Sequence, residues 1–523
     1  MTDRPEAANG LAANSARHKV RTLDELGMVA DLARAHGRKV VLAHGVFDLL
    51  HPGHIRHLEA AKREGDVLIV TCTADRFVNK GPNRPAFAEN LRAEMLAAVH
   101  CVDWVGVNMK PTAVNVIETI KPDVFVKGED YADPAQDITG KITDERQAVE
   151  SHGGRIVFTH DITFSSTTLI NRFLDIHEPR LRDYLDRLRG EDALAAIARE
   201  IEKLSTLEVL LVGETIIDEY SYVRAVGKSP KEHMIATRFE GNEVFAGGVI
   251  ATAKHVAEVC RRVVVVTVIG AEDGDATEAF LRRSLPANVE LIALRREGPT
   301  VRKVRFVDQG YLRKLFEVQH MDDRPIDRGL SERLEAEVAR RAPGAALTLV
   351  NDFGHGMILP SLVATLTGAA RFLAINVQSN SANLGFNLID KYPRADFLCI
   401  DTIEARLATR DRHNPIRYVA DDLLPRIIDC PRMIVTMGVE GCLVHEAGQP
   451  GRIIPAFTRT VTDTMGAGDA FFALASPLVA AGCPVEYAGL AGNAAGAIKV
   501  GIVGHRESVG KVALLKYITS LLR

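Results

Sequence analysis

The sequence predicts an α/β protein with two doubly wound parallel-sheet domains, because short apolar strands and longer helical segments alternate along it. Runs rich in β-branched residues, such as VVLAHG and VLIVTCT, alternate with helical segments over about 150 residues. A second series of such runs begins at LEVLLVGE. The length of 523 residues is also too great for a single hydrophobic core.

The first domain is predicted over residues 20–177, after a disordered tail of residues 1–19 that is small and polar. Its first helix should open at Thr22, since Thr22 and Glu25 have the spacing of a capping box. A strand follows, and the next helix should carry Pro52 in its first turn.

The remaining chain divides into a linker and a second domain. Residues 178–205 are charged and have a helical pattern, which suits a linker. The second α/β series fills residues 206–523. Within it, TVRKVRFVD and GYLRKLFEV alternate apolar and polar residues and predict a small exposed sheet.

Composition excludes several classes of protein. Lys and Arg number 64 and Asp and Glu 68, so the net charge of −4 gives no general attraction to nucleic acid or acidic membranes. The longest aliphatic run, Val263 to Ile269, is too short to cross a bilayer. The seven cysteines form no Cys-x-x-Cys pair and predict reduced thiols. We therefore expect a cytoplasmic protein with no nucleic-acid or membrane partner.

The segment GVFDLLHPGH, residues 45–54, carries the first candidate catalytic residues. It joins a strand to a helix, and a helix N-terminus attracts phosphate through its unpaired N–H groups and its dipole. His51 and His54 add donors that can stabilise charge on phosphorus, and Gly45 allows close approach of the backbone. Alternatively the histidines cap the helix or bind zinc, although no Cys or His at suitable spacing completes a zinc site.

This segment resembles the G-x-F-D-x-x-H-x-G-H motif of the cytidylyltransferase-like nucleotidyltransferases. NKGPNRP at residues 79–85, VKGEDY at 126–131 and SSTTLI at 165–170 resemble segments of the sugar-phosphate adenylyltransferases, with Glu129 in place of a glycine. The resemblance covers residues 38–175. It implies a Rossmann-like domain in which a sugar phosphate attacks the α-phosphorus of a nucleoside triphosphate and pyrophosphate leaves.

The resemblance also implies roles for single residues. His51 and His54 would contact the triphosphate and stabilise the transition state. Lys80 and Arg84 would neutralise phosphate charge, or alternatively belong to a solvated loop. The motif does not name the base, so a polyol-phosphate cytidylyltransferase stays an alternative. The residues implied in nucleotide or phosphate binding are Gly45, Phe47, Asp48, Lys80, Arg84, Asp130, Ser166 and Thr167.

The segment TDTMGAGDAFFA, residues 462–473, carries the second group of candidates. A glycine-rich turn at a helix start forms an anion hole, and an Asp beside it can accept a hydroxyl proton. Asp469 is thus a candidate general base, or alternatively an ordinary helix cap. The segment resembles the D-T-x-G-A-G-D motif of the ribokinase-like carbohydrate kinases. The resemblance covers residues 206–510 and implies a ribokinase-like fold with a small β lid.

Four further segments, VGETIID, AGGVIATA, DTIE and VTMGVEG, resemble the same family. They imply a site with four parts, formed by an anion hole, a nucleotide side, a sugar side and a magnesium ligand. Gly466, Ala467 and Gly468 would form the anion hole, and Thr436 and Gly438 the nucleotide side. Asp218, Gly247 and Gly248 would form the sugar side, and Glu404 would bind magnesium.

The acceptor side of this domain departs from the family pattern. Ala251 replaces an Asn that grips the sugar, and Glu214 replaces an Asp. Residues 376–387, NVQSNSANLGFN, replace an Asp-Pro pair, so Asn376 and Asn380 are candidates to bind the acceptor. Alternatively these asparagines only cap turns. The domain could then be a sugar-binding module without catalysis.

The two halves together resemble the bifunctional heptose-7-phosphate kinase/heptose-1-phosphate adenylyltransferases, in which the kinase usually precedes the transferase. The resemblance implies ADP-heptose or a similar nucleotide-activated sugar as the product. It also implies ATP and Mg²⁺ as cofactors, and a sugar phosphate and a nucleoside triphosphate as substrates. Because exposed strands of ribokinase-like lids often pair between subunits, we expect a homo-oligomer, most simply a dimer.

Overall fold

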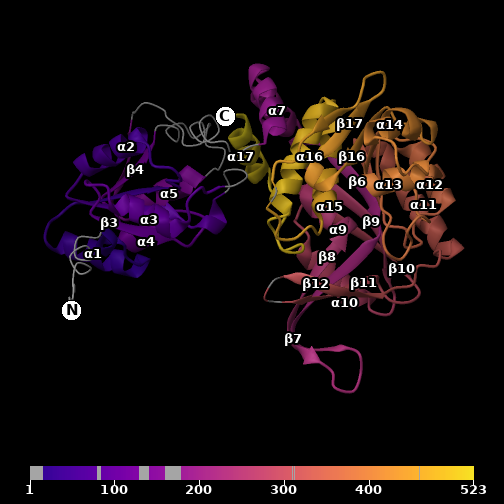
Figure 1. Ribbon diagram of the computed structural model, residues 1–523, viewed down its shortest axis with the longest axis horizontal. Coiled ribbons are helices and arrows are strands. Elements are labelled where there is room, and N and C mark those ends of the chain that lie inside the picture. The colour runs from indigo at the N-terminus through magenta and orange to yellow at the C-terminus, as the bar shows by residue number, and fades with distance from the viewer. Residues whose placement is uncertain are drawn as a thin grey trace, which may run out of the picture. The chain divides into compact units, whose positions relative to one another are not determined.

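The computed structural model describes residues 16–78, 84–128, 141–159, 178–308, 310, 312–458 and 460–523 (Figure 1). The chain divides into two compact units. The first is Met1–Glu178 with Leu515–Leu521 and Arg523, and the second is Pro179–Leu514 with Leu522. Each unit contains a parallel sheet with helices, so the predicted fold class is confirmed.

The first unit has a five-stranded parallel sheet in the order β3-β2-β1-β4-β5. Its strands are β1 (Val40–Gly45), β2 (Val67–Thr73), β3 (Trp104–Asn108), β4 (Val124–Gly128) and β5 (Arg155–Thr159). Its helices are α1 (Leu23–Ala35), α2 (Pro52–Arg63), α3 (Glu89–Ala97), α4 (Val114–Ile120) and α5 (Lys141–Ser151), with short turns η2 (Ala16–Lys19) and η3 (Asp75–Phe77).

The period of two along β1 explains how helices cover both faces of this sheet. Val41 and Ala43 pack into one core cluster, together with Leu58 of α2. Val40 and Leu42 point the other way, into a second cluster with residues of α1 and α4. Successive strand residues alternate between faces, so a strand buried on both sides must be apolar throughout. This explains the continuous apolar runs in the sequence.

The start of the first unit differs in part from the prediction. The capping box is confirmed, because Thr22 N–H donates to Glu25 at 2.7 Å and Glu25 N–H donates to Thr22 Oγ1 at 3.3 Å. The predicted disordered tail is wrong for residues 16–19, which form the turn η2. Lys19 Nζ donates a hydrogen bond from this turn to the carbonyl of Val102 at 2.8 Å. The residues around Lys19 could not predict this contact, because Val102 lies far away in the sequence. Residues 1–15 lie outside the described part.

The second unit is built on a nine-stranded sheet in the order β10-β9-β6-β13-β14-β15-β16-β17-β18. All neighbouring strands pair in parallel except at one edge, where β17 runs antiparallel to both β16 and β18. The strands are β6 (Glu208–Gly213), β9 (Arg262–Gly270), β10 (Val289–Arg296), β13 (Leu347–Asp352), β14 (Leu373–Val377), β15 (Phe397–Asp401), β16 (Arg432–Thr436), β17 (Cys442–Glu446) and β18 (Arg452–Ile454).

The helices of the second unit include α15 and α16, which pack on each other, and α9, which packs on α15 (Figure 1). The α-helices of this unit are α7 (Pro179–Gly190), α8 (Ala193–Lys203), α9 (Val249–Ala257), α10 (Gly274–Ser284), α11 (Arg328–Arg341), α12 (Pro360–Ala369), α13 (Thr402–Thr409), α14 (Ile416–Tyr418), α15 (Ala467–Ala480) and α16 (Val485–Lys499). The residues of α17 (Lys511–Leu522) are divided between the two units. None of the described helices is both long and apolar enough to cross a bilayer.

Helices α7 and α8 fill the segment predicted as a helical linker. Both belong to the second compact unit. Arg187 of α7 pairs with Glu486 of α16, and Lys511 of α17 pairs with Glu202 of α8 at 2.7 Å. Residues 178–205 are therefore helical, and they are held to the second unit by ion pairs that the local sequence does not reveal.

A separate four-stranded sheet, here called the lid, has the order β12-β11-β7-β8. Its strands are β7 (Thr215–Lys228), β8 (Ile235–Gly248), β11 (Arg302–Asp308) and β12 (Arg313–His320), and β7 and β8 project as a long hairpin in Figure 1. The alternation noted in the sequence correctly predicted β11 and β12. The two longer strands were not predicted as lid strands, because only their outer halves are exposed.

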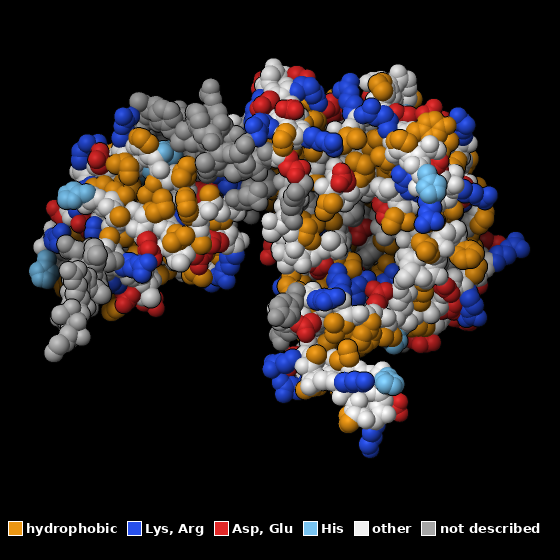
Figure 2. All heavy atoms as spheres, in the orientation of Figure 1, with side chains coloured by type: hydrophobic (Ala, Val, Ile, Leu, Met, Phe, Trp, Pro, Cys, Tyr) orange, Lys and Arg blue, Asp and Glu red, His pale blue; other side chains and the backbone are white. Residues whose placement is uncertain are grey.

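Charged side chains of both signs mingle over the face of the protein shown in Figure 2. This mixture agrees with the small net charge of −4. It gives no broad single-sign surface on that face of the kind that steers nucleic acid.

We predict that Arg92 holds the first unit together. Its fully buried guanidinium donates to the carbonyls of Phe87, Val46 and Thr73 and to the carboxylate of Asp75. Arg92→Leu leaves these acceptors without their donor, so unfolding should become easier by about 3 kcal/mol. Denaturant titration followed by the fluorescence of Trp104, the only tryptophan, measures this loss within β3.

The matched control is Arg155→Ala. Arg155 pairs with Glu64 at the surface, where its side chain is 56% exposed. Such a pair contributes less than about 1 kcal/mol. An equally small loss in both variants would contradict the structural role of Arg92.

Candidate functional site

The segment between β1 and α2 places two imidazoles at a helix N-terminus. His51 caps α2, accepting the N–H of Gly53 on Nδ1 at 3.2 Å. The ring of His54 stacks on His51 with centroids 3.9 Å apart and meets Phe47 edge-on at 5.3 Å. A Cβ on Gly45 would lie 3.2 Å from the Phe47 ring, so glycine leaves room for that ring. His51 thus serves as a cap, and both imidazoles stand where a phosphate would meet the helix dipole.

Asp48 and Arg84 form a buried ion pair beside the histidines. Arg84 Nη1 lies 2.9 Å from Asp48 Oδ2, and Ala86 N–H donates to Asp48 Oδ1 at 2.5 Å. The side chain of Arg84 is only 2% exposed, and burial lowers its pKa. Arg84 is therefore not part of a solvated loop. Four other predicted residues lie outside the described part of the chain, namely Lys80, Asp130, Ser166 and Thr167.

In the second unit, Asp469 lies in the first turn of α15, directly after the glycine turn that begins at Gly466. Its carboxylate is 9% exposed, and it accepts a hydrogen bond from Gln378 Nε2 at 3.2 Å. Burial raises the pKa of this carboxyl. Gly466 adopts a left-handed φ of 72°, which favours glycine, and Ala467 begins the helix after it. A Cβ on Gly468 would meet nothing within 4 Å, so the turn is open there.

The lid contributes Asp218 to the same region. Arg305 of β11 pairs with Oδ1 of Asp218, and the Nε2 atom of His505 lies 3.5 Å from Oδ2. Burial alone would raise the pKa of Asp218, but the nearby His505 imidazole and the charge of Arg305 outweigh burial and lower it to about 2. A Cβ on Gly247 would lie 1.9 Å from Oδ2, and Gly248 has a φ of 58°. Gly247 thus makes room for this carboxylate, whereas Gly248 lets the chain pass close to the carbonyl of Glu214.

Glu404 and Asp401 form the N-terminal cap of α13. Each carboxylate accepts the backbone N–H of the other, and Glu404 Oε1 also accepts the N–H of Ser379 at 3.1 Å. Burial and the charge of Asp401 raise the pKa of Glu404 to about 8. Thr436 ends the neighbouring strand β16, where it pairs with Asp401, and Gly438 begins the turn that follows this strand. These residues share the carboxyl edge of the sheet, where open α/β sheets bind ligands.

The asparagine-rich loop uses its amides internally. Asn376 Nδ2 donates to the carbonyl of Cys399 at 2.7 Å, and Asn380 Nδ2 donates to the carbonyl of Phe353 at 2.8 Å. Asn383 and Asn387 likewise donate to carbonyls at the end of β13 and beyond it. The described contacts favour the alternative that these amides fix the loop, as they do in turns.

The structure adds residues to this site that sequence reasoning missed. Lys499 is fully buried in α16 and donates to the carbonyls of Met465 and Gly504. Burial lowers its pKa to about 8. Lys303 and Arg305 lie on the lid face that carries Asp218. The only sequence signal for Lys303 and Arg305 was the alternation in the lid strands. Lys499 belongs to no motif, so nothing in the sequence singled it out.

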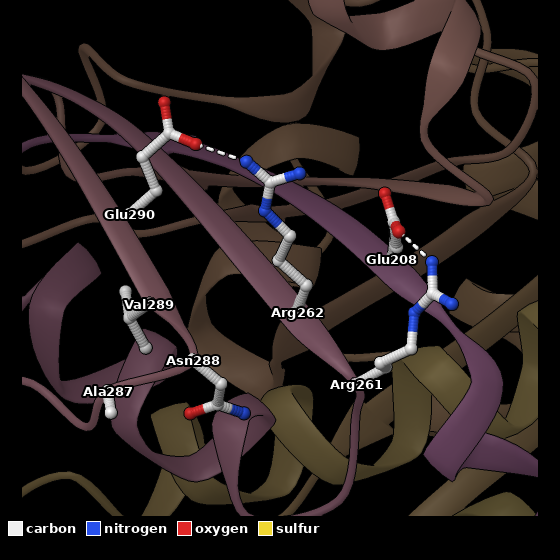
Figure 3. Close-up of a pocket in the computed structure, with 7 residues that line it drawn as sticks. All are labelled: Glu208, Arg261, Arg262, Ala287, Asn288, Val289 and Glu290. Carbon is white, nitrogen blue, oxygen red and sulfur yellow. Dashed lines mark hydrogen bonds and ion pairs between the residues drawn. The ribbon is translucent and has the colours of Figure 1, made fainter.

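The open hollow drawn in Figure 3 lies away from these residues. It is at the amino ends of β6, β9 and β10, whereas the candidate residues lie at carboxyl ends. Its arginines are engaged, because Arg261 pairs with Glu208 and Arg262 pairs with Glu290. It therefore offers no uncompensated cation to a ligand.

Family models match both halves of the chain. Residues 42–173 match the cytidylyltransferase-like family, and residues 358–511 match the pfkB family of carbohydrate kinases. The two matches fall on the two parts of the chain that carry the two motifs, in the same order.

Relatives and solved structures agree with this division. The Bifunctional protein HldE of Syntrophotalea carbinolica is 39% identical over 163 residues, which are 31% of this chain and 32% of the relative. The Bifunctional protein HldE of Geobacter metallireducens is 40% identical over 154 residues, which are 29% of this chain and 30% of the relative. The chain spans about a third of the length of these relatives. Phosphofructokinase-2 from Escherichia coli covers 61% of this chain and 100% of its own at 15% identity and a TM-score of 0.50, which supports the fold of the second unit.

We predict that Asp218 makes the stability of the second unit sensitive to acid. Its folded pKa of about 2 lies below the unfolded value, so its contribution is present above about pH 4 and is lost as the pH falls toward 2. Asp218→Asn should cost about 2 kcal/mol at pH 7, and its deficit against the wild type should shrink between pH 4 and pH 3.

Thermal unfolding at each pH measures this difference. Asp31→Asn is the control, since Asp31 is 77% exposed and pairs only with Arg34 in the described part of the chain. A deficit of Asp218→Asn that stays constant from pH 7 to pH 3 would contradict the prediction.

Proposed function

We propose that the chain is a bifunctional enzyme that makes a nucleotide-activated sugar of the heptose type. The second unit would phosphorylate a sugar or sugar phosphate with ATP. The first would transfer a nucleotidyl group, with adenylyl as the leading candidate, to a sugar 1-phosphate. The observation that carries the proposal is that the two motifs each stand at a helix N-terminus, at His51–His54 and at Gly466–Asp469, in two separate units. The matches to both families and to proteins named bifunctional support it.

In the first unit the reaction needs positioning more than acid or base. The attacking phosphate oxygen is already an anion, so it bonds to the α-phosphorus while pyrophosphate leaves. The stacked imidazoles of His51 and His54 would donate to phosphate oxygens as charge develops there. The Asp48–Arg84 pair would hold the loop after β1 in place behind them.

In the second unit Asp469 would accept the proton of the acceptor hydroxyl. The hydroxyl oxygen then bonds to the γ-phosphorus, the bond from that phosphorus to the bridging oxygen breaks, and ADP leaves. A buried carboxylate with a raised pKa suits this role as base. The backbone of Gly466–Gly468 would face the transferred phosphoryl group, and Asp218 would orient the acceptor.

The residues fit a magnesium ion that is held mainly by the nucleotide. Within the described ranges, no three His, Cys, Asp or Glu side chains are grouped as a metal cage. Mg²⁺ typically takes one or two carboxylates and otherwise phosphates and water. Glu404 and Asp401 would offer such a pair, and a nearby cation would offset the burial and the Asp401 charge that raise the pKa of Glu404. Bound there, Mg²⁺ would neutralise phosphate charge.

We predict that the two activities can be removed separately. His54→Ala should lower pyrophosphate release at least about a hundredfold and leave acceptor-dependent ADP formation intact. Asp469→Asn should do the reverse, because each side chain acts in its own unit. Each variant is the control for the other in paired assays of pyrophosphate and ADP.

Three outcomes would change the proposal. Loss of both activities in one folded variant would contradict two independent sites. Pyrophosphate release with CTP and none with ATP would support the cytidylyltransferase alternative. Absence of ADP formation in the wild type with every sugar and sugar phosphate tried would support a non-catalytic binding module.

We also propose that the protein is a dimer that pairs through the outer face of the lid. Strand register puts Asp218 and Lys303 on one face, and Val304, Phe306 and Phe316 on the other. Phe316 is 55% exposed, and its ring stacks on Phe306 at 4.6 Å. Figure 2 shows hydrophobic side chains gathered near the base of the projecting hairpin. A contiguous apolar sheet face of this kind marks an interaction surface.

Phe316→Lys should therefore weaken the dimer at least about tenfold, because a central aromatic residue commonly carries more than 1 kcal/mol of binding. Sedimentation velocity over a concentration series measures the dissociation constant. Ile453→Lys is the control, since Ile453 is 47% exposed on β18, outside the lid. A wild-type monomer, or equal weakening in both variants, would contradict the lid interface.

A further inference from the structure

His505 lies in the candidate kinase site although no motif includes it. It follows α16 in a tight turn and is 5% exposed. The turn is fixed because Gly504 N–H donates to Asp463 Oδ2 at 2.8 Å, and Lys499 donates to the Gly504 carbonyl. Lys254 Nζ also donates to the carbonyl of His505 at 3.4 Å. The imidazole therefore has a defined position.

The two ring nitrogens of His505 face different parts of the site. Nε2 lies 3.5 Å from Asp218 Oδ2. The opposite edge faces the glycine turn, since a Cβ on Gly466 would lie 2.6 Å from Cε1 and 3.1 Å from Nδ1 of His505. Nδ1 is buried and has no hydrogen-bond partner among the residues that the structure describes. The ring thus joins the acceptor side of the site to its anion-binding side.

The charges around this ring come from several elements. Asp218 with Arg305 faces it from the lid, Lys254 and His255 from α9, Asp469 from α15 and Lys499 from α16. Burial raises the pKa of Asp469 and the charge of Asp218 adds to this, whereas His505 and Lys499 act in the opposite sense. The imidazole therefore acts electrostatically on both carboxylates that the reaction needs.

We propose that His505 is a positioning residue of the kinase reaction, which holds Asp218 toward the acceptor and supports the ionised form of Asp469 from behind the Gly466 turn. This inference rests on the proposed kinase function. The proton of the acceptor goes to Asp469, and His505 is neither consumed nor bonded to the substrate. In its protonated form the ring carries positive charge between the two carboxylates, which favours their joint ionisation.

The test compares His505→Leu with His505→Gln in the full-length enzyme. The leucine removes both the polar contact with Asp218 and the charge, so KM for the acceptor should rise about tenfold as Asp218 keeps Arg305 but loses His505. The acid limb of the kcat/KM profile should move to higher pH, because Asp469 loses a nearby cation and ionises later. The glutamine keeps an amide donor toward Asp218, so it should restore KM and leave the acid limb displaced.

His445→Gln is the matched control. His445 is also buried and lies 2.6 Å from the carboxylate of Asp421, on β17 and outside the site. It should change neither KM nor the acid limb. A His505→Leu enzyme with unchanged KM and an unchanged acid limb would overturn the inference, as would an equal effect of His445→Gln.

A spectroscopic measurement separates this inference from the kinase proposal itself. In protein labelled at histidine Cε1, the signal of His505 is assigned by its loss in His505→Gln. Asp218→Asn should displace that signal and leave the signal of His445 in place. An unmoved His505 signal would overturn the inference even in an active enzyme. If Asp218→Asn displaces the signal but the wild type has no kinase activity, the Asp218–His505 contact is supported and the proposed kinase function is refuted.

Discussion

The second unit depends on one carboxylate, Asp463, which holds the lid to the core. It accepts the hydroxyl of Tyr220 at 2.7 Å and the ammonium of Lys314 at 2.7 Å, both from lid strands. It also accepts the N–H of Met465 at 3.0 Å and of Gly504 at 2.8 Å, from the two loops that carry the glycine turn and His505. These donors lower its pKa, so it stays ionised in the folded state. One side chain therefore contacts the lid, the loop that leads into the glycine turn and the turn that carries His505.

Local sequence patterns were sufficient to predict features whose residues all lie within one short segment. The fold class followed from alternating strands and helices, and the cap at Thr22 from the spacing to Glu25. The same patterns could not reveal contacts between distant segments. His505 meets Asp218 across 287 positions of sequence numbering, that is 505 − 218, and neither position carries a signal for the other. Asp463 lay inside a quoted motif, yet its partners in the lid could only be seen in three dimensions.

Two predicted site residues show how one spacing can serve two purposes. The D-x-x-E pattern of Asp401 and Glu404 was interpreted as a metal motif, and the same spacing forms a capping box at α13. Likewise His51 stands in a phosphate-binding motif and also caps α2. In both cases the cap fixes the side chain at a helix N-terminus, which is where an anion or its counter-ion binds. The structural role therefore explains the position of the residue and leaves the proposed chemical role open to the experiments above.

Charge balance explains why this site needs its lid. Three carboxylates of this region are buried, namely Asp218, Asp463 and Asp469, and the charge of Asp218 acts on Asp469. Burying charge without partners is costly. The lid brings Arg305 to the first and Lys314 to the second. Without the lid strands, Asp463 and Asp469 would keep mainly Lys499 and His505 as nearby basic groups. Because the lid supplies both Asp218 and the cations that offset Asp218 and Asp463, packing the lid on the core brings these carboxylates and their counter-charges together in the same step.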